Sequence, residues 1–194
     1  MTCTTDVDHD GGQPSTGFVG LLAPRPPDSG AQWVRADLRL YSGRGSVWVA
    51  LTGTGGALSL VQLGMLERAD GPRLFLAHGW GEPGTGHYTE CDMGPADRLL
   101  HTFRVGRSGG FFRLLIDGVT VLTLVDDLPW PTNRAQVMSE SHAPAMPGIK
   151  ARDMVVDGAL PDSWSQTWGI GNDADVDWYP GLDINRPDGF RVWA

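Results

Sequence analysis

Lysine is almost missing from this 194-residue chain, which has only Lys150 among its 15 basic residues. Acidic residues number 23, so the formal net charge is −8 and the isoelectric point lies near 4.9. Nucleic-acid backbones and anionic lipid surfaces are bound by clustered lysine and arginine. The charge balance therefore predicts a protein that binds no nucleic acid.

Long apolar runs are missing too. No stretch approaches the roughly 20 apolar residues that a membrane-spanning helix needs. The first residues, Met1–Asp10, are acidic and no apolar segment follows them, whereas a secretory signal begins with basic residues and continues with apolar ones. We therefore expect no membrane insertion, and synthesis in the cytoplasm.

Cysteine is scarce, with Cys3 and Cys91 as the only two. One bridge between them is one alternative. Because Cys3 lies in a polar terminal segment and the cytoplasm keeps thiols reduced, we expect two free thiols.

Common catalytic and cofactor motifs do not occur. The chain has no Gly-x-Ser-x-Gly elbow, no phosphate-binding loop and no dinucleotide fingerprint. Its histidines do not have the spacing of zinc ligands. We therefore expect no cofactor.

Glycine and proline are abundant, at 27 and 14 residues, which favours many turns over long helices. Segment Trp33–Tyr41 alternates apolar and polar residues, as a half-buried strand does. Its apolar face is Val34, Ala36, Leu38 and Leu40, and its polar face is Arg35, Asp37 and Arg39. Segment Leu58–Glu67 is apolar on both faces, which indicates a central strand.

The clearest local signal is a pair of tight turns. Segments His101–Arg107, Phe111–Ile116 and Val119–Val125 are separated by Ser-Gly-Gly and Asp-Gly. These residues supply the positive φ angles that hairpin turns require. The three segments are predicted to form consecutive antiparallel strands.

The whole pattern predicts an all-β fold, a two-sheet antiparallel jelly-roll sandwich over residues 32–158. Residues 1–31 are expected to be an N-terminal arm with one short strand, Gly17–Leu22. Residues 159–194 are expected to be an irregular, tryptophan-rich C-terminal extension. Both ends could contact protein partners, so we expect a homo-oligomer or a larger assembly.

The hairpin segment His101–Val119 resembles one found in concanavalin A-like lectin and glucanase domains, where a strand ends in an Asp-Gly turn. The resemblance implies a concanavalin A-like jelly roll and says little about the ligand.

A second resemblance is to the glutamic peptidases (eqolisins), which share that fold. Leu60–Gly64 matches their Gln-x-Gly strand, Ala135–Glu140 matches their late Ala-x-x-x-x-Glu strand, and Leu74–Pro83 is a degraded match to their aromatic strand. By this resemblance Glu140 would be the general base acting on water, and Gln62 would stabilise the oxyanion. Alternatively, Glu140 is a solvent-facing strand residue and Gln62 a structural amide.

Two further groups are candidate binding residues. Trp48, Trp80 and Trp130 could stack on sugar rings, although core packing is the more frequent use of tryptophan. Asp173, Asp175 and Asp177 alternate in an acidic segment and could bind Ca²⁺. The helix-flanked calcium loop, however, has Gly and Glu where this chain has Trp178 and Ile184.

The leading functional hypothesis is a non-enzymatic structural or recognition sandwich. In its concrete form it is a virion component, such as a phage capsid decoration or tail protein, with a role in attachment to glycan or protein. A glutamic-peptidase-like hydrolase is the alternative, and a free-standing carbohydrate-binding module is the second alternative.

Overall fold

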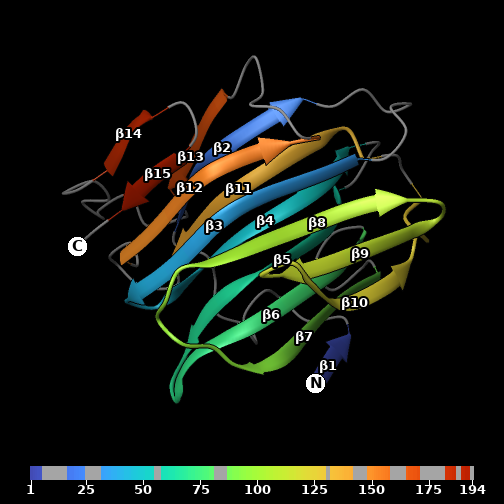
Figure 1. Cartoon of the computed structure of the whole chain (residues 1–194), viewed down its shortest axis with the longest axis horizontal. Helices are drawn as coiled ribbons and strands as arrows, with labels where there is room; N and C mark the ends of the chain where they lie inside the picture. The colour runs from blue at the N-terminus through green and yellow to red at the C-terminus, as the bar shows by residue number, and fades with distance from the viewer. Residues whose placement is uncertain are drawn as a thin grey trace.

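The computed structural model describes residues 1–5, 17–24, 32–54, 58–80, 87–129, 132–141, 148–157, 165–170, 182–186 and 189–192. Strands and tight turns make up these ranges, and no helix in them is long and apolar enough to cross a membrane. The strands form two antiparallel sheets that pack face to face, with β3 and β8 passing in front of β4 and β5 (Figure 1). The predicted all-β two-sheet sandwich is confirmed, and the two antiparallel sheets fit the concanavalin A-like jelly roll.

The eight-stranded sheet has the order β1-β7-β6-β5-β4-β11-β2-β13. Its strands are β1 (Thr2–Thr5), β2 (Gly17–Pro24), β4 (Gly45–Thr54), β5 (Leu58–Arg68), β6 (Gly71–Trp80), β7 (His87–Pro95), β11 (Arg134–Ser141) and β13 (Ser165–Ile170). Strand β5 is buried on both faces and lies between β4 and β6, in agreement with its continuous apolar sequence.

The seven-stranded sheet has the order β10-β9-β8-β3-β12-β15-β14. Its strands are β3 (Gln32–Ser42), β8 (His101–Ser108), β9 (Phe111–Ile116), β10 (Val119–Val125), β12 (Gly148–Val156), β14 (Leu182–Arg186) and β15 (Gly189–Val192). Strands β8, β9 and β10 form the predicted pair of hairpins. Gly109, Gly110, Asp117 and Gly118 have φ angles of 61°, 79°, 50° and 80°, the positive values that tight hairpin turns need.

The core lies between the sheets and uses the faces that alternation predicts. On β3, Val34, Ala36, Leu38 and Leu40 are all fully buried, while the residues between them are partly exposed. From the other strands the fully buried core residues include Val47, Val49, Leu51, Leu63, Met65, Phe103, Val105, Leu114, Val137 and Ile149. Burial of this apolar area is the main stabilising contribution to the fold.

Both terminal segments contribute strands to the chain's own sheets. β2 lies between β11 and β13, so the single strand expected in the N-terminal segment is an internal strand of the sheet. β13, β14 and β15 come from the segment predicted to be irregular, and that prediction is wrong for these residues. Its mixture of Trp, Gly, Asp and Pro has no strand periodicity, so the pattern could not reveal them. Assembly through the terminal arms stays a prediction.

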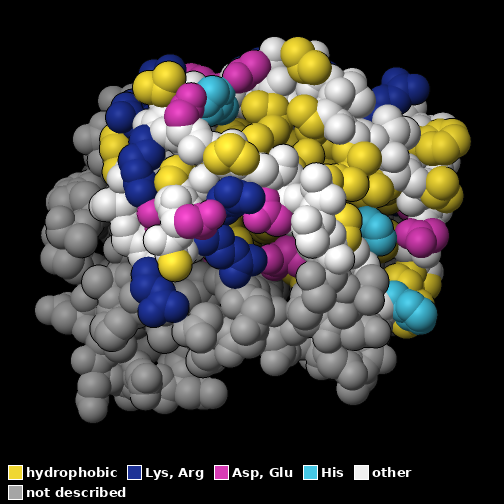
Figure 2. Space-filling model, turned by 90° about the horizontal axis from the view of Figure 1, so that it is seen from below, with side chains coloured by type: hydrophobic (Ala, Val, Ile, Leu, Met, Phe, Trp, Pro, Cys, Tyr) yellow, Lys and Arg dark blue, Asp and Glu magenta, His cyan; other side chains and the backbone are white. Residues whose placement is uncertain are grey.

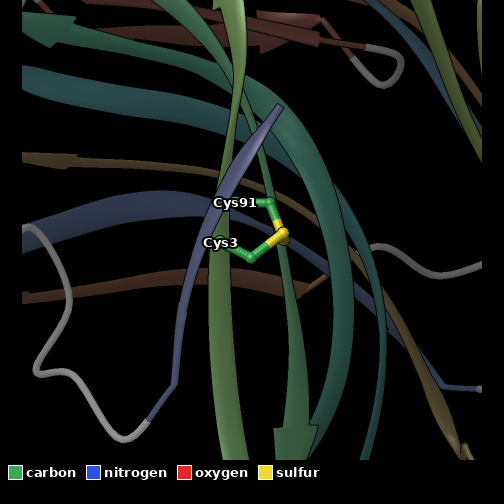
Figure 3. The surroundings of a disulfide bond; sticks show 2 residues. All are labelled: Cys3 and Cys91. Carbon is green, nitrogen blue, oxygen red and sulfur yellow. A yellow bond between two sulfur atoms is a disulfide. The ribbon is translucent and has the colours of Figure 1, made fainter.

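The expectation of two free thiols is wrong. Strand β1 pairs with β7 in a register that sets Cys3 directly opposite Cys91, and the two form a disulfide with a Cα–Cα distance of 3.9 Å (Figure 3). Cys91 is a buried core residue, whereas Cys3 is exposed. The sequence did not predict β1, so it could not predict that the two thiols meet.

Candidate functional site

Gln62 and Glu140, the pair implied by the peptidase resemblance, are not brought together. Gln62 on β5 lies opposite Ala50 on β4, which lies opposite Gln136 on β11, and Glu140 is four residues further along β11. The offset is roughly 13 Å along the strands and about 10 Å across two strand spacings. One water cannot touch both side chains at that separation, so this arrangement does not supply the base–oxyanion pair.

Gln62 is nonetheless an unusual residue of the eight-stranded sheet. Its side chain is 2% exposed, and its Nε2 has no hydrogen-bond partner. A buried amide of this kind normally has a hydrogen-bond partner, which Gln62 Nε2 lacks. Gln62 lies opposite Ala50 on β4 and opposite Ala77 on β6. Ala77 in turn lies opposite Glu90 on β7.

The three candidate tryptophans do not form one site. Trp48 is 7% exposed and packs in an apolar cluster with Leu66, Phe75 and Met138 on the outer side of the eight-stranded sheet. Trp80 lies near the end of β6, with its ring centroid 4.6 Å from that of His87. Trp130 lies outside the described residues. Trp48 is therefore used in packing.

The aspartates proposed for calcium, Asp173, Asp175 and Asp177, lie outside the described residues. Within the described ranges, no group of three or more His, Cys, Asp or Glu side chains could hold a metal ion. The calcium site stays a prediction.

A different site appears on the outer face of the seven-stranded sheet. The alternation that buries Val34 and Ala36 turns Trp33 and Arg35 outward on β3. The residues opposite Trp33 and Arg35 on the neighbouring strands face outward as well. Arg35 lies opposite Arg104, and Trp33 lies opposite Gly106, which in turn lies opposite Arg113. Three arginines and a tryptophan are thus gathered around one glycine.

This arrangement forms a half-open depression of about 190 Å³. We call it the arginine pocket. Its lining includes Trp33, Arg104, Gly106, Arg107, Arg113, Leu115 and Thr120. Gly106 lines the pocket without a side chain; a Cβ there would make an ordinary contact with Trp33 Cβ, at 3.4 Å, and would occupy part of this space. The Arg104 guanidinium carbon lies 4.3 Å from the centre of the Trp33 ring, a cation–π contact that orients it.

Within the described residues, Arg35, Arg104 and Arg113 have no acidic partner, whereas Arg107 at the end of the pocket pairs with Asp126, and several arginines elsewhere are also paired. Arg68, Arg73 and Arg98 pair with Glu90, Asp92 and Glu67 at 2.7, 3.0 and 2.6 Å. For Arg35, Arg104 and Arg113 the described structure has no ion pair, and the Nε atoms of Arg35 and Arg104 are buried without a hydrogen-bond partner. An unsatisfied charged donor of this kind costs free energy.

The pKa of Arg104 also reflects its burial beside another positive charge. Burial, and secondarily the positive charge of Arg35, lower the pKa of the Arg104 guanidinium below its ordinary value. Arg104 remains protonated at neutral pH, because arginine does not lose its proton in proteins near that pH. Arg35 and Arg104 lie opposite each other and have no ion pair among the described residues, so an anion bound there would stabilise them.

A polar network of hydrogen-bonded side chains lies beside the pocket, at the start of β3. Arg107 Nε donates to Asp126 Oδ2 at 2.5 Å, and Arg107 Nη1 donates to Thr132 Oγ1 at 3.2 Å. The Thr132 hydroxyl donates to Gln32 Oε1, and Gln32 is 1% exposed beside Trp33. This network fixes the start of β3 and therefore the position of the Trp33 ring.

Sequence reasoning placed Arg35 on the outer face of its strand but did not identify the pocket. Arg104 and Arg113 belong to other strands, and only the register across β3, β8 and β9 shows that they meet. The signal that could have been read is the absence of an acidic residue at the outward positions nearest these arginines on β8 and β9.

A second polar cluster lies at the opposite end of β8. His101 Nδ1 lies 2.6 Å from Asp117 Oδ2, and His101 Nε2 lies 2.8 Å from Asp97 Oδ1. Partial burial lowers the pKa of His101, but the hydrogen bonds to Asp117 and Asp97 outweigh it, so the pKa lies above 6.5. Asp117 also accepts a hydrogen bond from the Thr102 amide at 2.9 Å, so the cluster closes the β9–β10 turn onto β8.

No family model matches this chain, and no curated protein matches it. Solved structures with a similar fold include the galectin LEC-6 from Caenorhabditis elegans, which aligns with 66% of this chain and 88% of its own at 16% identity and a TM-score of 0.45. A beta-glucanase from Bacillus licheniformis aligns with 66% of this chain and 64% of its own at 15% identity and a TM-score of 0.44. CG-16, a homodimeric agglutinin from chicken liver, aligns with 71% of this chain and 99% of its own at 10% identity and a TM-score of 0.45. At these identities the likeness concerns the fold alone.

Proposed function

We propose that this protein is a non-catalytic recognition domain that binds an acidic saccharide in the arginine pocket. One observation carries the proposal: Arg104 and Arg113, neither paired with a carboxylate of the described residues, line a depression together with Trp33. In a chain of net charge −8, an uncompensated cationic patch is a specific feature and not a consequence of composition.

The guanidinium groups select the acidic part of the ligand. A planar guanidinium matches a carboxylate or a sulfate through two parallel hydrogen bonds. Arg104 is partly buried and Arg113 is exposed, so one hydrogen-bonds the anion near the base of the pocket and the other near its rim. The buried Arg104 Nε, which has no acceptor in the structure, gains one from the ligand.

The remaining lining suits a sugar ring. Trp33, Gly106 and Leu115 provide apolar surface that can contact the C–H groups of the sugar. The Thr120 hydroxyl can hydrogen-bond a hydroxyl of the sugar. A volume of about 190 Å³ is below the roughly 300–1,000 Å³ of drug-sized sites, which fits one ring with one acidic substituent. The proposal develops the carbohydrate-binding alternative of the sequence; the capsid or tail role stays a prediction.

Isothermal titration calorimetry with glucuronate, galacturonate, glucose 6-sulfate and glucose tests the proposal. We expect binding of at least one acidic sugar and none of glucose. Arg104→Gln and Arg113→Gln should each weaken it about 10-fold or more, because a hydrogen bond to a charged group contributes about 1.5–3 kcal/mol.

Arg134→Gln is the matched control. Arg134 is an exposed arginine at the start of β11 on the other sheet, so the variant makes the same charge change away from the pocket. Its affinity should stay within about two-fold of the parent, since a remote charge acts only through a screened potential. Equal losses in all three variants, or binding of glucose as tight as that of the acids, would contradict the proposal.

A further inference from the structure

Strand β10 is the outermost strand of the seven-stranded sheet and pairs, within the described structure, with β9 alone. In Figure 1 it lies at the free lower margin of that sheet. An edge strand presents a row of backbone N–H and C=O groups without ladder partners. Such an edge is a template for one more strand.

The side chains around this edge are apolar and exposed. Seven large hydrophobic residues are exposed in the described part of the chain, and four of them, Phe111, Val119, Val121 and Val125, lie on β9 and β10. Val119 and Val125 are 66% and 67% exposed. Figure 2, viewed from below, shows hydrophobic side chains gathered in a continuous band on this side of the molecule.

The usual protections of an edge strand are few here. The sequence of β10, Val-Thr-Val-Leu-Thr-Leu-Val, has no charged residue and no proline, and its one irregularity is a register shift between Thr120 and Leu122. The other sheet is closed on the same side of the molecule, because β1 covers β7 and is tied to it by the Cys3–Cys91 disulfide. Only β10 combines seven residues with exposed valines among the described edge strands.

We propose that β10 pairs antiparallel with β10 of a second copy of this chain, about a two-fold axis, so that two seven-stranded sheets become one continuous sheet. The composition of the strand favours this occupant. A partner strand bearing charges would lose their hydration against valines and leucines, whereas Val, Thr and Leu pair well across antiparallel strands.

Closure is the second argument for a second copy. Pairing of β10 with another edge, such as β1 or β13, would leave one β10 unpaired in every assembly that does not close into a ring. A two-fold pairing uses the same patch on both subunits and leaves no free β10. The proposed partner of β10 is therefore β10 of a second copy of this chain.

The charges around the strand give the interface a salt signature. Each copy carries a net charge of −8, and Asp117, Asp126 and Asp127 flank the two ends of β10. Antiparallel pairing sets the Asp117 end of one copy beside the Asp126 end of the other. Screening of this repulsion strengthens the dimer as salt rises, whereas an interface held by ion pairs would weaken.

The pairing has a consequence for binding. Thr120 lies on β10 and also lines the arginine pocket, so the dimer carries two pockets on one continuous sheet face. A ligand with several acidic sugars would engage both and bind more tightly than a single sugar. The dimer itself rests on the edge strand alone and stands whether or not the pocket binds sugar.

Sedimentation equilibrium of the full chain from about 1 to 500 µM tests the pairing. We expect a monomer–dimer equilibrium that shifts toward dimer in higher salt. Val119→Lys with Val125→Lys should weaken the dimer about 100-fold, since two charges per copy lose hydration at the edge. Both residues are largely exposed, so the thermal unfolding midpoint at low concentration should stay unchanged.

Leu99→Lys is the matched control. Leu99 is 60% exposed and lies in the segment between β7 and β8, away from β10. This variant should dimerise like the parent. A chain that stays monomeric at 500 µM, or a dimer unaffected by the Val119 and Val125 changes, would overturn the proposal.

Cross-linking checks the geometry. Val121 lies near the middle of β10, close to the proposed two-fold axis, so Val121→Cys should give a disulfide-linked dimer on a non-reducing gel. Leu99→Cys should give none above the level of random collisions. Equal cross-linking of the two variants would place the contact elsewhere and refute the strand pairing.

Discussion

The two sheets share one core but differ on the sides that face away from it. The outer side of the eight-stranded sheet holds buried apolar residues, with Trp48, Leu66, Phe75 and Met138 at 2% to 7% exposure. The outer side of the seven-stranded sheet holds Arg35, Arg104 and Arg113, which have no acidic partner in the described part of the chain, around the arginine pocket. Apolar packing therefore characterises the outer face of the eight-stranded sheet, and charged side chains characterise that of the seven-stranded sheet.

The largest expected effect separates these two faces. Phe75→Ala should lower the free energy of unfolding by about 4 kcal/mol, because it removes a ring that is 3% exposed within an apolar cluster. Arg113→Ala should change it by less than about 0.5 kcal/mol, since Arg113 is exposed. Urea unfolding measures both. Similar losses in the two variants would mean that the outer faces do not differ as described.

The second effect concerns the edges of the sheets. Cys3→Ser removes the disulfide that ties β1 to β7 across a sequence separation of 88, and should cost about 3 kcal/mol of unfolding free energy. The exposed Cys3 is the residue to change, because Cys91 is buried in the core. The parent protein under reducing conditions should unfold at the same urea concentration as Cys3→Ser. A parent protein unaffected by reductant would show that the bond contributes nothing.

Glycines on the two sheets give a third comparison. A Cβ at Gly64 on β5 would lie 2.0 Å from the Val47 carbonyl oxygen, whereas one at Gly106 on β8 would have its nearest neighbour at 3.4 Å. Gly64→Ala must move backbone and should cost about 2 kcal/mol, and Gly106→Ala should cost less than about 1 kcal/mol.

Gly106→Ala also narrows the arginine pocket, so it should weaken ligand binding without a comparable loss of stability. Thermal unfolding and calorimetry on the same samples separate these two readouts. A Gly106→Ala protein that is as unstable as Gly64→Ala would show that the pocket floor is part of the packed structure.

The alternation in the sequence predicts most of the fold and little of the site. Segments Phe111–Ile116 and Val119–Val125 match the observed strands in both bounds, because period-two patterns and turn residues are local signals. β1, β7 and the C-terminal strands were not predicted, since their polar or mixed residues pair only through long-range register.

The site depends on that long-range register. The peptidase resemblance linked Gln62 and Glu140 by motif, but β4 and β11 set them four residues apart along the strands. The same kind of pairing brings Arg104 beside Arg35, which no motif announces. Distances along a sequence do not give neighbours across a sheet, so the pocket could be found only in three dimensions.

The smallest expected effect is the pH dependence of the His101 cluster. The pKa of His101 is raised above 6.5, so its contribution to stability is complete below pH 6.5 and is lost as the pH rises through the folded-state pKa. The pKa values of Asp97 and Asp117 are lowered below 3.8: for Asp97 mainly by the hydrogen bond to His101, and for Asp117 by hydrogen bonds that outweigh its burial. Their contribution is therefore present above pH 3.8 and is lost as the pH falls through the folded-state values.

The cluster is thus most stabilising from about pH 4 to about pH 6.5. His101→Gln should lower the unfolding free energy by less than about 1 kcal/mol near pH 5.5, because the partners are solvent-exposed. The difference from the parent should shrink at a higher pH, such as about 9, as the ring loses its proton in the folded state as well. Urea unfolding of both proteins at the two pH values measures this difference in unfolding free energy. A difference that stays constant across the range would show that the charge of His101 does not stabilise this turn.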